Sequence, residues 1–257
     1  MTGLRVKNLS FSYGARPVLR DINVSPLKPG SLTALIGPNA SGKSTLFRCI
    51  AGLLKPSAGE VWLDQTDLST LRQKPRLQRI CIMPQFFAAN AALTVFDVVL
   101  MAHKNLSGWR VSPEDVATVA DALDAGGISH LADAYIGELS GGQAQLVSVA
   151  QSLVRRSDVY LFDEPTSALD LRHQLDVLGQ IRSQMIARDA VGVVALHDLN
   201  LAARFADRLV LLGDGFIRAQ GPPSEVLSTS ELASVYGVDI QVAQGPKQEI
   251  SVHAYSP

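Results

Sequence analysis

The sequence is poor in cysteine, in long apolar runs and in charge of one sign. Its two cysteines, Cys49 and Cys81, are too few for a disulfide framework, and both fall in apolar segments that suit small core residues. A formal net charge of −1, with no block of like charges, gives no electrostatic basis for nucleic-acid binding. No apolar run approaches the roughly 20 residues that span a bilayer, and no signal-peptide pattern opens the chain. We therefore expect a soluble, cytosolic protein whose role at a membrane needs a partner.

The rest of the composition is that of a folded α/β protein. The chain has 257 residues, 47% of them hydrophobic and 18% charged, enough for one large domain or a core with a smaller lobe. Apolar segments at 4–11 and 19–24 predict strands, and the body after residue 31 alternates strands with helices. Between 86 and 140 the pattern predicts helices alone. The expected fold is α/β, with a mixed sheet, antiparallel strands at the start and an inserted helical lobe.

A glycine-bounded loop separates a buried strand, predicted at 31–36, from a helix predicted at 46–51. Glycines let backbone N–H groups turn inward around phosphate oxygens, and the helix N-terminus adds partial positive charge. Lys43 would reach the β- and γ-phosphates, and the Ser44 hydroxyl would bind Mg²⁺. An ordinary glycine-rich turn would not combine these positions with these flanks, so the sequence predicts a nucleoside triphosphate site. Its residues are Gly37, Pro38, Asn39, Ala40, Ser41, Gly42, Lys43, Ser44 and Thr45.

Two carboxylates, Asp163 and Glu164, follow an apolar strand predicted at 159–162. In P-loop enzymes an Asp at this place helps to hold Mg²⁺, and the adjacent Glu can act as a general base toward the attacking water. Acids at a strand end are usually just solvated. Here, however, the strand is apolar throughout, which puts both acids at the carboxyl edge of the sheet, where open α/β sheets bind ligands.

Two further strands, predicted at 80–83 and 193–196, lead to Gln85 and His197. Gln85 could reach Mg²⁺ or the attacking water, although most glutamines at such places are polar loop residues. His197 could contact the γ-phosphate, although a lone histidine is more often structural. The shared sheet edge favours the functional role for His197, whereas Gln85 alone is a weak signal.

A second glycine motif precedes another predicted helix, whose apolar stripe includes Leu146, Val149 and Leu153. A serine and two glycines at a helix start are typical of an anion site. A serine that merely caps the helix is the alternative, and without the first loop it would be equally favoured. The motif consists of Leu139, Ser140, Gly141, Gly142 and Gln143.

Taken in order, these motifs resemble the ATP-hydrolysing subunit of an ABC transporter over essentially the whole chain. The loop at 37–45 is similar to Walker A, 159–164 to Walker B and 139–143 to the signature motif. Gln85 stands in the place of the Q-loop glutamine and His197 in that of the switch histidine. The D-loop of the family corresponds to Ser167, Ala168, Leu169 and Asp170.

The resemblance implies that the chain binds ATP with Mg²⁺. Tyr13 falls where the family places an aromatic ring against adenine. Hydrolysis would depend on Glu164, with His197 holding the γ-phosphate. The residues expected to hold the metal are Ser44, Gln85 and Asp163, and the catalytic residues are Gln85, Glu164 and His197.

The resemblance also implies partners and a location. Two copies would pack head to tail, so that ATP lies between the P-loop of one and the signature motif of the other. A many-spanning membrane permease would hold the pair at the cytoplasmic face of the inner membrane, and an extracytoplasmic substrate-binding protein would act indirectly. The single ABC ATPase domain, 1–257, would consist of a core with its β subdomain at 1–85 and 157–257, and a helical subdomain at 86–156.

A narrower resemblance is to importers of iron–siderophore, haem and cobalamin, and it rests on the segments 94–100, 168–174, 197–202 and 235–238. One departure from the family pattern is the absence of arginine after the signature motif. This leaves the predicted catalytic residues in place and bears on how strongly the signature helix communicates with nucleotide. The neutral residues at these positions are Ala144, Leu146 and Gln151.

Other classes of protein stay open at this point. A soluble ABC ATPase of the iron–sulphur assembly type is compatible with the architecture, whereas translation factors usually carry two cassettes and repair proteins long insertions. Another importer or an exporter subunit is also compatible. A kinase or GTPase is disfavoured, because the motif at 139–143 has no role there.

Overall fold

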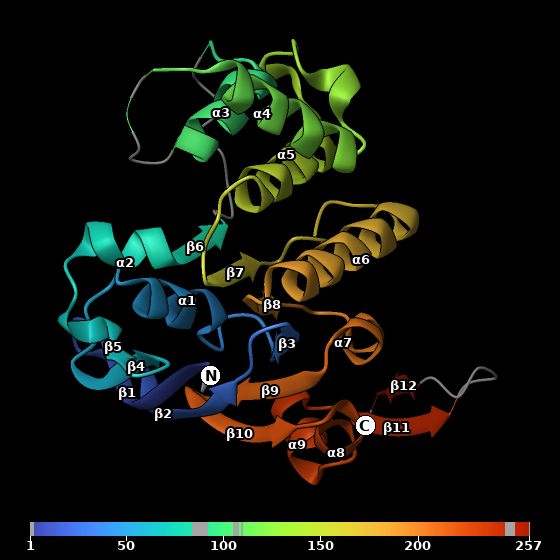
Figure 1. Cartoon of the computed structure of the whole chain (residues 1–257). Helices are drawn as coiled ribbons and strands as arrows, with labels where there is room; N and C mark the ends of the chain where they lie inside the picture. Colours follow the sequence, from blue (N-terminus) through green and yellow to red (C-terminus); the bar gives the residue numbers. More distant parts are fainter. Residues whose placement is uncertain (1–2, 84–91, 105–107, 109, 245–249, 257) are drawn as a thin grey trace.

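The computed structural model describes residues 3–83, 92–104, 108, 110–244 and 250–256. A lobe of helices stands apart from a larger body built on two sheets (Figure 1). None of the described helices is long and apolar enough to cross a membrane.

The larger sheet has six strands in the order β10-β9-β3-β8-β7-β6. Neighbouring strands run parallel except β9 and β10, which form an antiparallel hairpin. The predicted mixed sheet is confirmed. Its strands are β3 (Ser31–Ile36), β6 (Ile80–Met83), β7 (Val159–Asp163), β8 (Val191–Ala195), β9 (Arg208–Gly213) and β10 (Phe216–Gly221).

The smaller sheet has four antiparallel strands in the order β2-β1-β4-β5, which confirms the antiparallel start. Along β1 the side chains of Leu4, Val6, Leu9 and Phe11 are buried and face the larger sheet. The strands are β1 (Leu4–Tyr13), β2 (Arg16–Leu27), β4 (Ala58–Leu63) and β5 (Thr66–Asp67).

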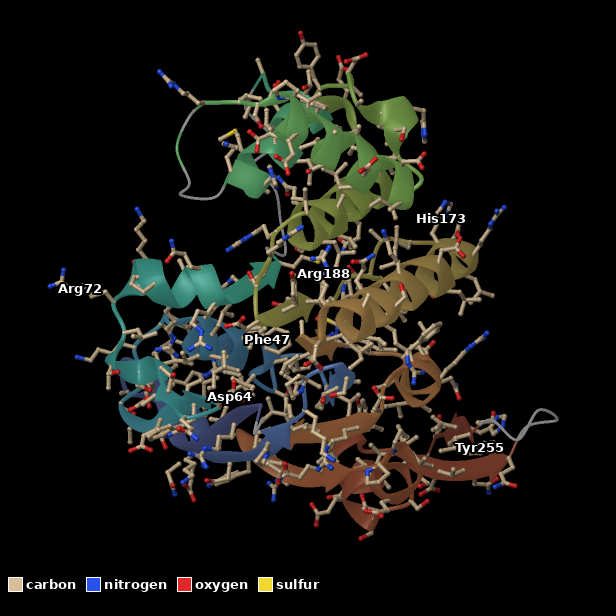
Figure 2. All side chains as sticks on the ribbon, in the orientation of Figure 1. Phe47, Asp64, Arg72, His173, Arg188 and Tyr255 are labelled. Atoms are coloured by element: carbon tan, nitrogen blue, oxygen red, sulfur yellow. The ribbon has the colours of Figure 1, made fainter. Side chains whose placement is uncertain are left out.

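Successive side chains along the strands of the larger sheet point to opposite faces, so each face packs into its own hydrophobic core. On β7, Val159 and Leu161 face the antiparallel sheet and α1, where Phe47 is fully buried (Figure 2), while Tyr160 and Phe162 face the opposite side. The helices around these cores are α1 (Lys43–Ala51), α2 (Gln73–Arg79), α6 (Leu171–Arg188), α7 (Leu199–Phe205), α8 (Pro223–Leu227) and α9 (Ser230–Tyr236), with a short 3-10 turn at Leu68–Thr70.

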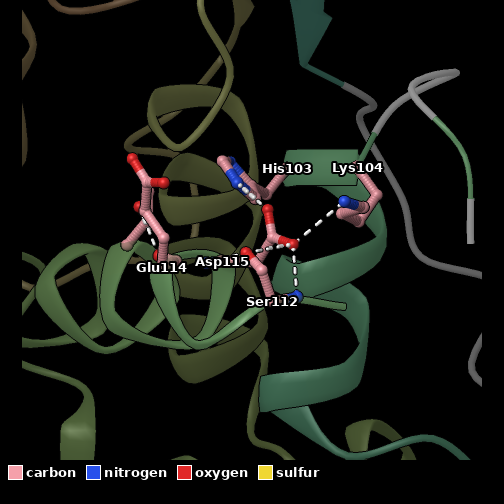
Figure 3. Close-up of polar contacts among 6 residues, drawn as sticks. His103, Lys104, Ser112, Glu114 and Asp115 are labelled. Carbon is pink, nitrogen blue, oxygen red and sulfur yellow. Dashed lines mark hydrogen bonds and ion pairs between the residues drawn. The ribbon is translucent and has the colours of Figure 1, made fainter. Parts of the chain in front are cut away.

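The helical lobe has its own core and is made of α3 (Val95–Lys104), α4 (Pro113–Ala125) and α5 (Gly141–Leu153), with 3-10 turns at Ser129–Leu131 and Ile136–Glu138. Asp115 joins two of its helices, because its carboxylate pairs with His103 and Lys104 of α3, each at 2.9 Å (Figure 3). The described residues between 92 and 140 form helices and 3-10 turns and no strand, as predicted, with one isolated antiparallel bridge between Thr94 and Tyr135.

The end of the chain forms a third, separate sheet of two antiparallel strands, β11 (Asp239–Gln244) and β12 (Ile250–Tyr255). The sequence predicted an edge strand or a loose end after Gln244. The side chain of Asn200 on α7 makes two hydrogen bonds to the backbone of Val252, at 2.7 and 3.2 Å, and so holds β12 against the body.

Candidate functional site

The predicted site residues converge because three adjacent parallel strands end at the same edge of the sheet (Figure 1). β3 leads to the loop at 37–42, β7 ends at Asp163, and β8 is followed closely by His197. The next strand, β6, leads toward Gln85, which lies outside the described residues.

The loop after β3 depends on glycine. Gly37 has a φ of 152°, and a Cβ on it would lie 2.2 Å from the carbonyl oxygen of Leu212, so no side chain fits there. Gly42, with a φ of 109°, occupies the N-cap position of α1. The helix therefore starts at Lys43, three residues before the predicted 46–51, and Lys43 and Ser44 lie in its first turn.

The side chain of Lys43 lies against the loop at 37–42, where it would also meet a bound phosphate. Its side chain is buried, and Nζ donates to the carbonyl oxygens of Gly37 at 2.8 Å and Pro38 at 3.1 Å. Burial lowers the pKa of Lys43, while the nearby carboxylates of Glu164 and Asp163 act in the opposite direction. The ammonium group thus lies within reach of both acids at the end of β7.

Asp163 is buried, with 5% of its surface exposed, and takes a hydrogen bond from the Ser44 hydroxyl. Burial raises the pKa of Asp163, and the bond from Ser44 opposes that shift. Asp163 Oδ1 and Ser41 Oγ, both buried, have no hydrogen-bond partner among the residues that the structure describes. A buried carboxylate oxygen without a donor is costly unless a cation or water completes it.

Glu164 points its carboxylate at His197, with 2.5 Å between Oε1 and Nε2. Its backbone is left-handed, with a φ of 52°, which is uncommon for a residue other than glycine. Its carbonyl oxygen accepts hydrogen bonds from Gln145 Nε2 at 3.0 Å and from Ser167 Oγ at 3.2 Å and N at 3.3 Å. The two expected catalytic residues in the described chain are therefore in direct contact.

An open pocket of about 680 Å³, within the range of small-molecule sites, is lined by Lys43, Ser44 and Glu164 among these residues. The exposed ring of Tyr13, set edge-on against Phe11 with centroids 4.8 Å apart, forms one side of it. Arg16 and Val18 also line the pocket and are not predictable from the sequence, because they reach it through the β1–β2 hairpin, which folds beside the loop. The lining is Tyr13, Arg16, Val18, Asn39, Ala40, Gly42, Lys43, Ser44, Thr45 and Glu164.

The motif at 139–143 lies elsewhere. Ser140 caps α5 through a capping box: its Oγ accepts from Gln143 N at 3.3 Å, and its N donates to Gln143 Oε1 at 2.9 Å. A Cβ on Gly142 would lie 3.1 Å from the carbonyl oxygen of Ala168, so the motif adjoins the segment 167–170. Ser140, Gly142, Gln143, Ala168, Leu169 and Asp170 line a second pocket, of about 730 Å³, that shares no residue with the first.

Asp170 ends the segment 167–170 and caps α6, where its carboxylate accepts from His173 N at 3.0 Å. His173 lies at the exposed start of this helix (Figure 2). Hydrogen bonds from His173 hold the pKa of Asp170 below its usual range.

The fold and the loop after β3 define a P-loop nucleotide-binding protein. Residues 19–167 match the family model described as ABC transporter, and the chain belongs to that family. It is accordingly a protein that binds and hydrolyses ATP.

The chain is similar along most of its length to curated members. It is 38% identical to a hemin import ATP-binding protein, HmuV, of Thermobifida fusca, over 95% of this chain and 85% of the relative. It is 36% identical to a petrobactin import ATP-binding protein, FpuD, of Bacillus anthracis, over 95% and 89%. Among solved structures, the dimeric bacterial ABC transporter cassette MJ0796 matches with a TM-score of 0.78 and 27% identity, over 86% of this chain and 98% of that one.

Proposed function

We propose that this chain is the ATP-hydrolysing subunit of an importer that takes up an iron–siderophore, haem or cobalamin-type ligand through a separate membrane subunit. The observation that carries the proposal is the similarity to the hemin and petrobactin import subunits over 95% of this chain. The ligand class follows from those relatives alone, because an ATPase subunit acts through the permease and does not touch the ligand.

ATP would lie in the pocket beside the loop at 37–45. The backbone N–H groups at the start of α1 and the Lys43 ammonium would hold the phosphates, and Tyr13 would stack on adenine. Lys43 now donates to two carbonyl oxygens of the loop. Arriving phosphate oxygens would compete for this ammonium group, which supports a role for Lys43 as the phosphate-binding cation.

Mg²⁺ fits the residues at the end of β7. The described residues contain no group of three or more His, Cys, Asp or Glu that could hold a metal by themselves. Mg²⁺, however, is usually bound by one or two carboxylates together with substrate phosphates. Asp163, with its unpaired Oδ1, and Ser44 would hold it together with Gln85. Mg²⁺ would neutralise charge on the β- and γ-phosphates.

Glu164 would take the proton of the attacking water, and His197 would contact the γ-phosphate. Their mutual contact supports this pairing, because a histidine on the carboxylate can orient it before nucleotide arrives. The segment 167–170 would border the site of the partner copy.

The separation of the two pockets supports a head-to-tail homodimer. Within one chain the motif at 139–143 shares no lining residue with the ATP pocket, so it would serve the nucleotide of a second copy. The dimeric form of MJ0796 is consistent with this arrangement, and two-fold dimers are the commonest protein assembly. In the single chain Ser140 caps α5, and in the dimer it would also face the nucleotide of the partner copy.

The pair would sit at the cytoplasmic face of the membrane, bound to a many-spanning permease, and an extracytoplasmic protein would deliver the ligand. The whole chain would act as one ABC ATPase domain, with 86–156 as its helical subdomain and 1–85 with 157–257 as its core and β subdomain.

Purification of the tagged chain from native membranes in mild detergent tests this function. We expect a very apolar, many-spanning subunit to co-purify, with two ATPase chains per complex. Recovery of soluble partners alone, such as iron–sulphur assembly proteins, would overturn the transport function.

A further inference from the structure

The backbone carbonyl of Glu164 is held by three donors. Two come from Ser167, three residues further along the same turn, through N and Oγ. The third comes from Gln145 Nε2, at 3.0 Å. Of the described side chains that donate to this carbonyl, Gln145 is the one that belongs to the helical lobe.

The conformation of Glu164 needs such support. Its φ of 52° places it in the left-handed region, which is strained for a residue with a Cβ. Pro165 follows, and proline further restricts the residue before it. Local sequence therefore does not favour this backbone, and the hydrogen bonds to its carbonyl compensate for the strain.

Gln145 lies early in α5, two residues after the end of the motif 139–143. The start of α5 thus carries the motif, and the next residues reach back to the end of β7 in the same chain. Gln145 belongs to α5, whereas Glu164 follows β7. A rigid-body displacement of α5 therefore moves Gln145 Nε2 relative to the carbonyl oxygen of Glu164.

We propose that Gln145 is a positioning residue for Glu164, and that it makes the general base of one site depend on the position of the signature helix. This rests on the proposed function, in which the start of α5 faces the nucleotide of the partner copy. Nucleotide bound there sets the position of α5, and Gln145 carries that position to Glu164 in its own chain. The site therefore hydrolyses ATP efficiently only when the second site is also filled. The hydrogen bond from Gln145 to the Glu164 carbonyl involves no charged group, so the absence of arginine after the motif does not remove it.

The test compares three single variants of the full-length chain in steady-state ATP hydrolysis. Gln145→Met keeps the length of the side chain and removes the donor, and Gln145→Glu does so with an isosteric group. Gln151→Met is the matched control, because Gln151 lies on the same helix and donates to the Val98 carbonyl at the same 3.0 Å, within the helical lobe.

We expect both Gln145 variants to lower kcat about tenfold, equivalent to about 1.4 kcal/mol in the barrier. KM should change less than about twofold, because the phosphate-binding loop is untouched. The Hill coefficient for ATP should fall toward 1. Gln151→Met should keep the wild-type kcat, KM and Hill coefficient. Equal kcat values for the Gln145 variants and the control would overturn the proposal.

A double-variant measurement separates positioning from a general structural effect. In the Glu164→Gln background, single-turnover hydrolysis with radiolabelled ATP should fall less than about twofold when Gln145→Met is added, because the group it positions is already gone. A full tenfold further loss would overturn the proposal even if the single variants behave as expected. Undiminished hydrolysis by Glu164→Gln alone would instead refute the role of Glu164 in the proposed function.

Discussion

Arg76 is a buried cation that the structure uses to close the end of the P-loop helix, and its replacement by methionine gives a quantitative prediction. Arg76 is 5% exposed, and its guanidinium donates to Cys49 O at 2.9 Å, to Ile50 O at 2.7 and 3.0 Å and to Leu68 O at 3.2 Å. Two of these acceptors are the last carbonyls of α1, which lack partners inside the helix and carry its negative end.

The loss of folding free energy in Arg76→Met depends on which hydrogen bonds each of these carbonyl oxygens retains. Cys49 O still accepts from Gly52 N, and Leu68 O from Leu71 N, whereas Ile50 O loses both of its bonds from Arg76. A buried acceptor left without a donor costs about 1–3 kcal/mol, and each lost bond from a charged group about 1.5–3. Removing the buried charge recovers part of this, because burial already disfavours the ion and lowers the pKa of Arg76. The net loss should be about 3 kcal/mol.

For a domain of this size, about 3 kcal/mol corresponds to a Tm lower by roughly 6–12 °C. Differential scanning calorimetry measures it. Arg79→Met is the matched control on the same helix, because Arg79 forms a surface ion pair with Asp158 that should contribute at most about 1 kcal/mol. A Tm for Arg76→Met within about 2 °C of the control would refute the reasoning.

Three further predictions concern the site and the helical lobe. Gly37→Ala should weaken ATP binding more than about tenfold, because its Cβ would lie 2.2 Å from a backbone oxygen; Gly237→Ala, at a φ of 66° with open space around it, should leave binding unchanged in isothermal titration calorimetry. Mixing Ser140→Ala with Lys43→Ala chains should give more hydrolysis than either variant alone, through one intact site per mixed dimer, but less than wild type because the second site binds ATP poorly; no recovery would argue against head-to-tail packing. The Ser112 backbone N–H, Lys104, the Ser112 hydroxyl and His103 hold the pKa of Asp115 well below its usual range. Its stabilising effect is therefore fully present above the unfolded-state pKa of about 4 and is lost as pH falls from there through the depressed folded-state pKa. The difference in urea midpoint between wild type and Asp115→Asn should therefore match at pH 7 and pH 5 and narrow below about pH 4; a gap that narrows already between pH 7 and pH 5 would count against it.

The sequence predicted the parts of the site whose chemistry is local. The loop at 37–45 and the acids Asp163 and Glu164 each adjoin a strand that the sequence also predicts, so the sequence indicates both the motif and its place in the sheet. The sequence predicts that His197 and Glu164 lie at one edge of the sheet, and the structure adds their direct contact.

Contacts between distant segments were not predictable in this way. Nothing near Arg76 in the sequence indicates that it closes α1, 26 residues before it, and nothing near Gln145 indicates that it reaches Glu164. The sequence does not distinguish an edge strand from a loose end after Gln244, because the segment that precedes β12 is polar. The placement of β12 depends on Asn200, 52 residues earlier in the chain.

The most direct test of the proposed site is the state of Glu164→Gln in the presence of ATP. Without the general base, ATP should bind and be hydrolysed only very slowly, and the two copies should stay closed around it. Size-exclusion chromatography with ATP and Mg²⁺ should then show a stable dimer that contains ATP, while the nucleotide-free variant elutes as a monomer. A monomer under both conditions would contradict the account.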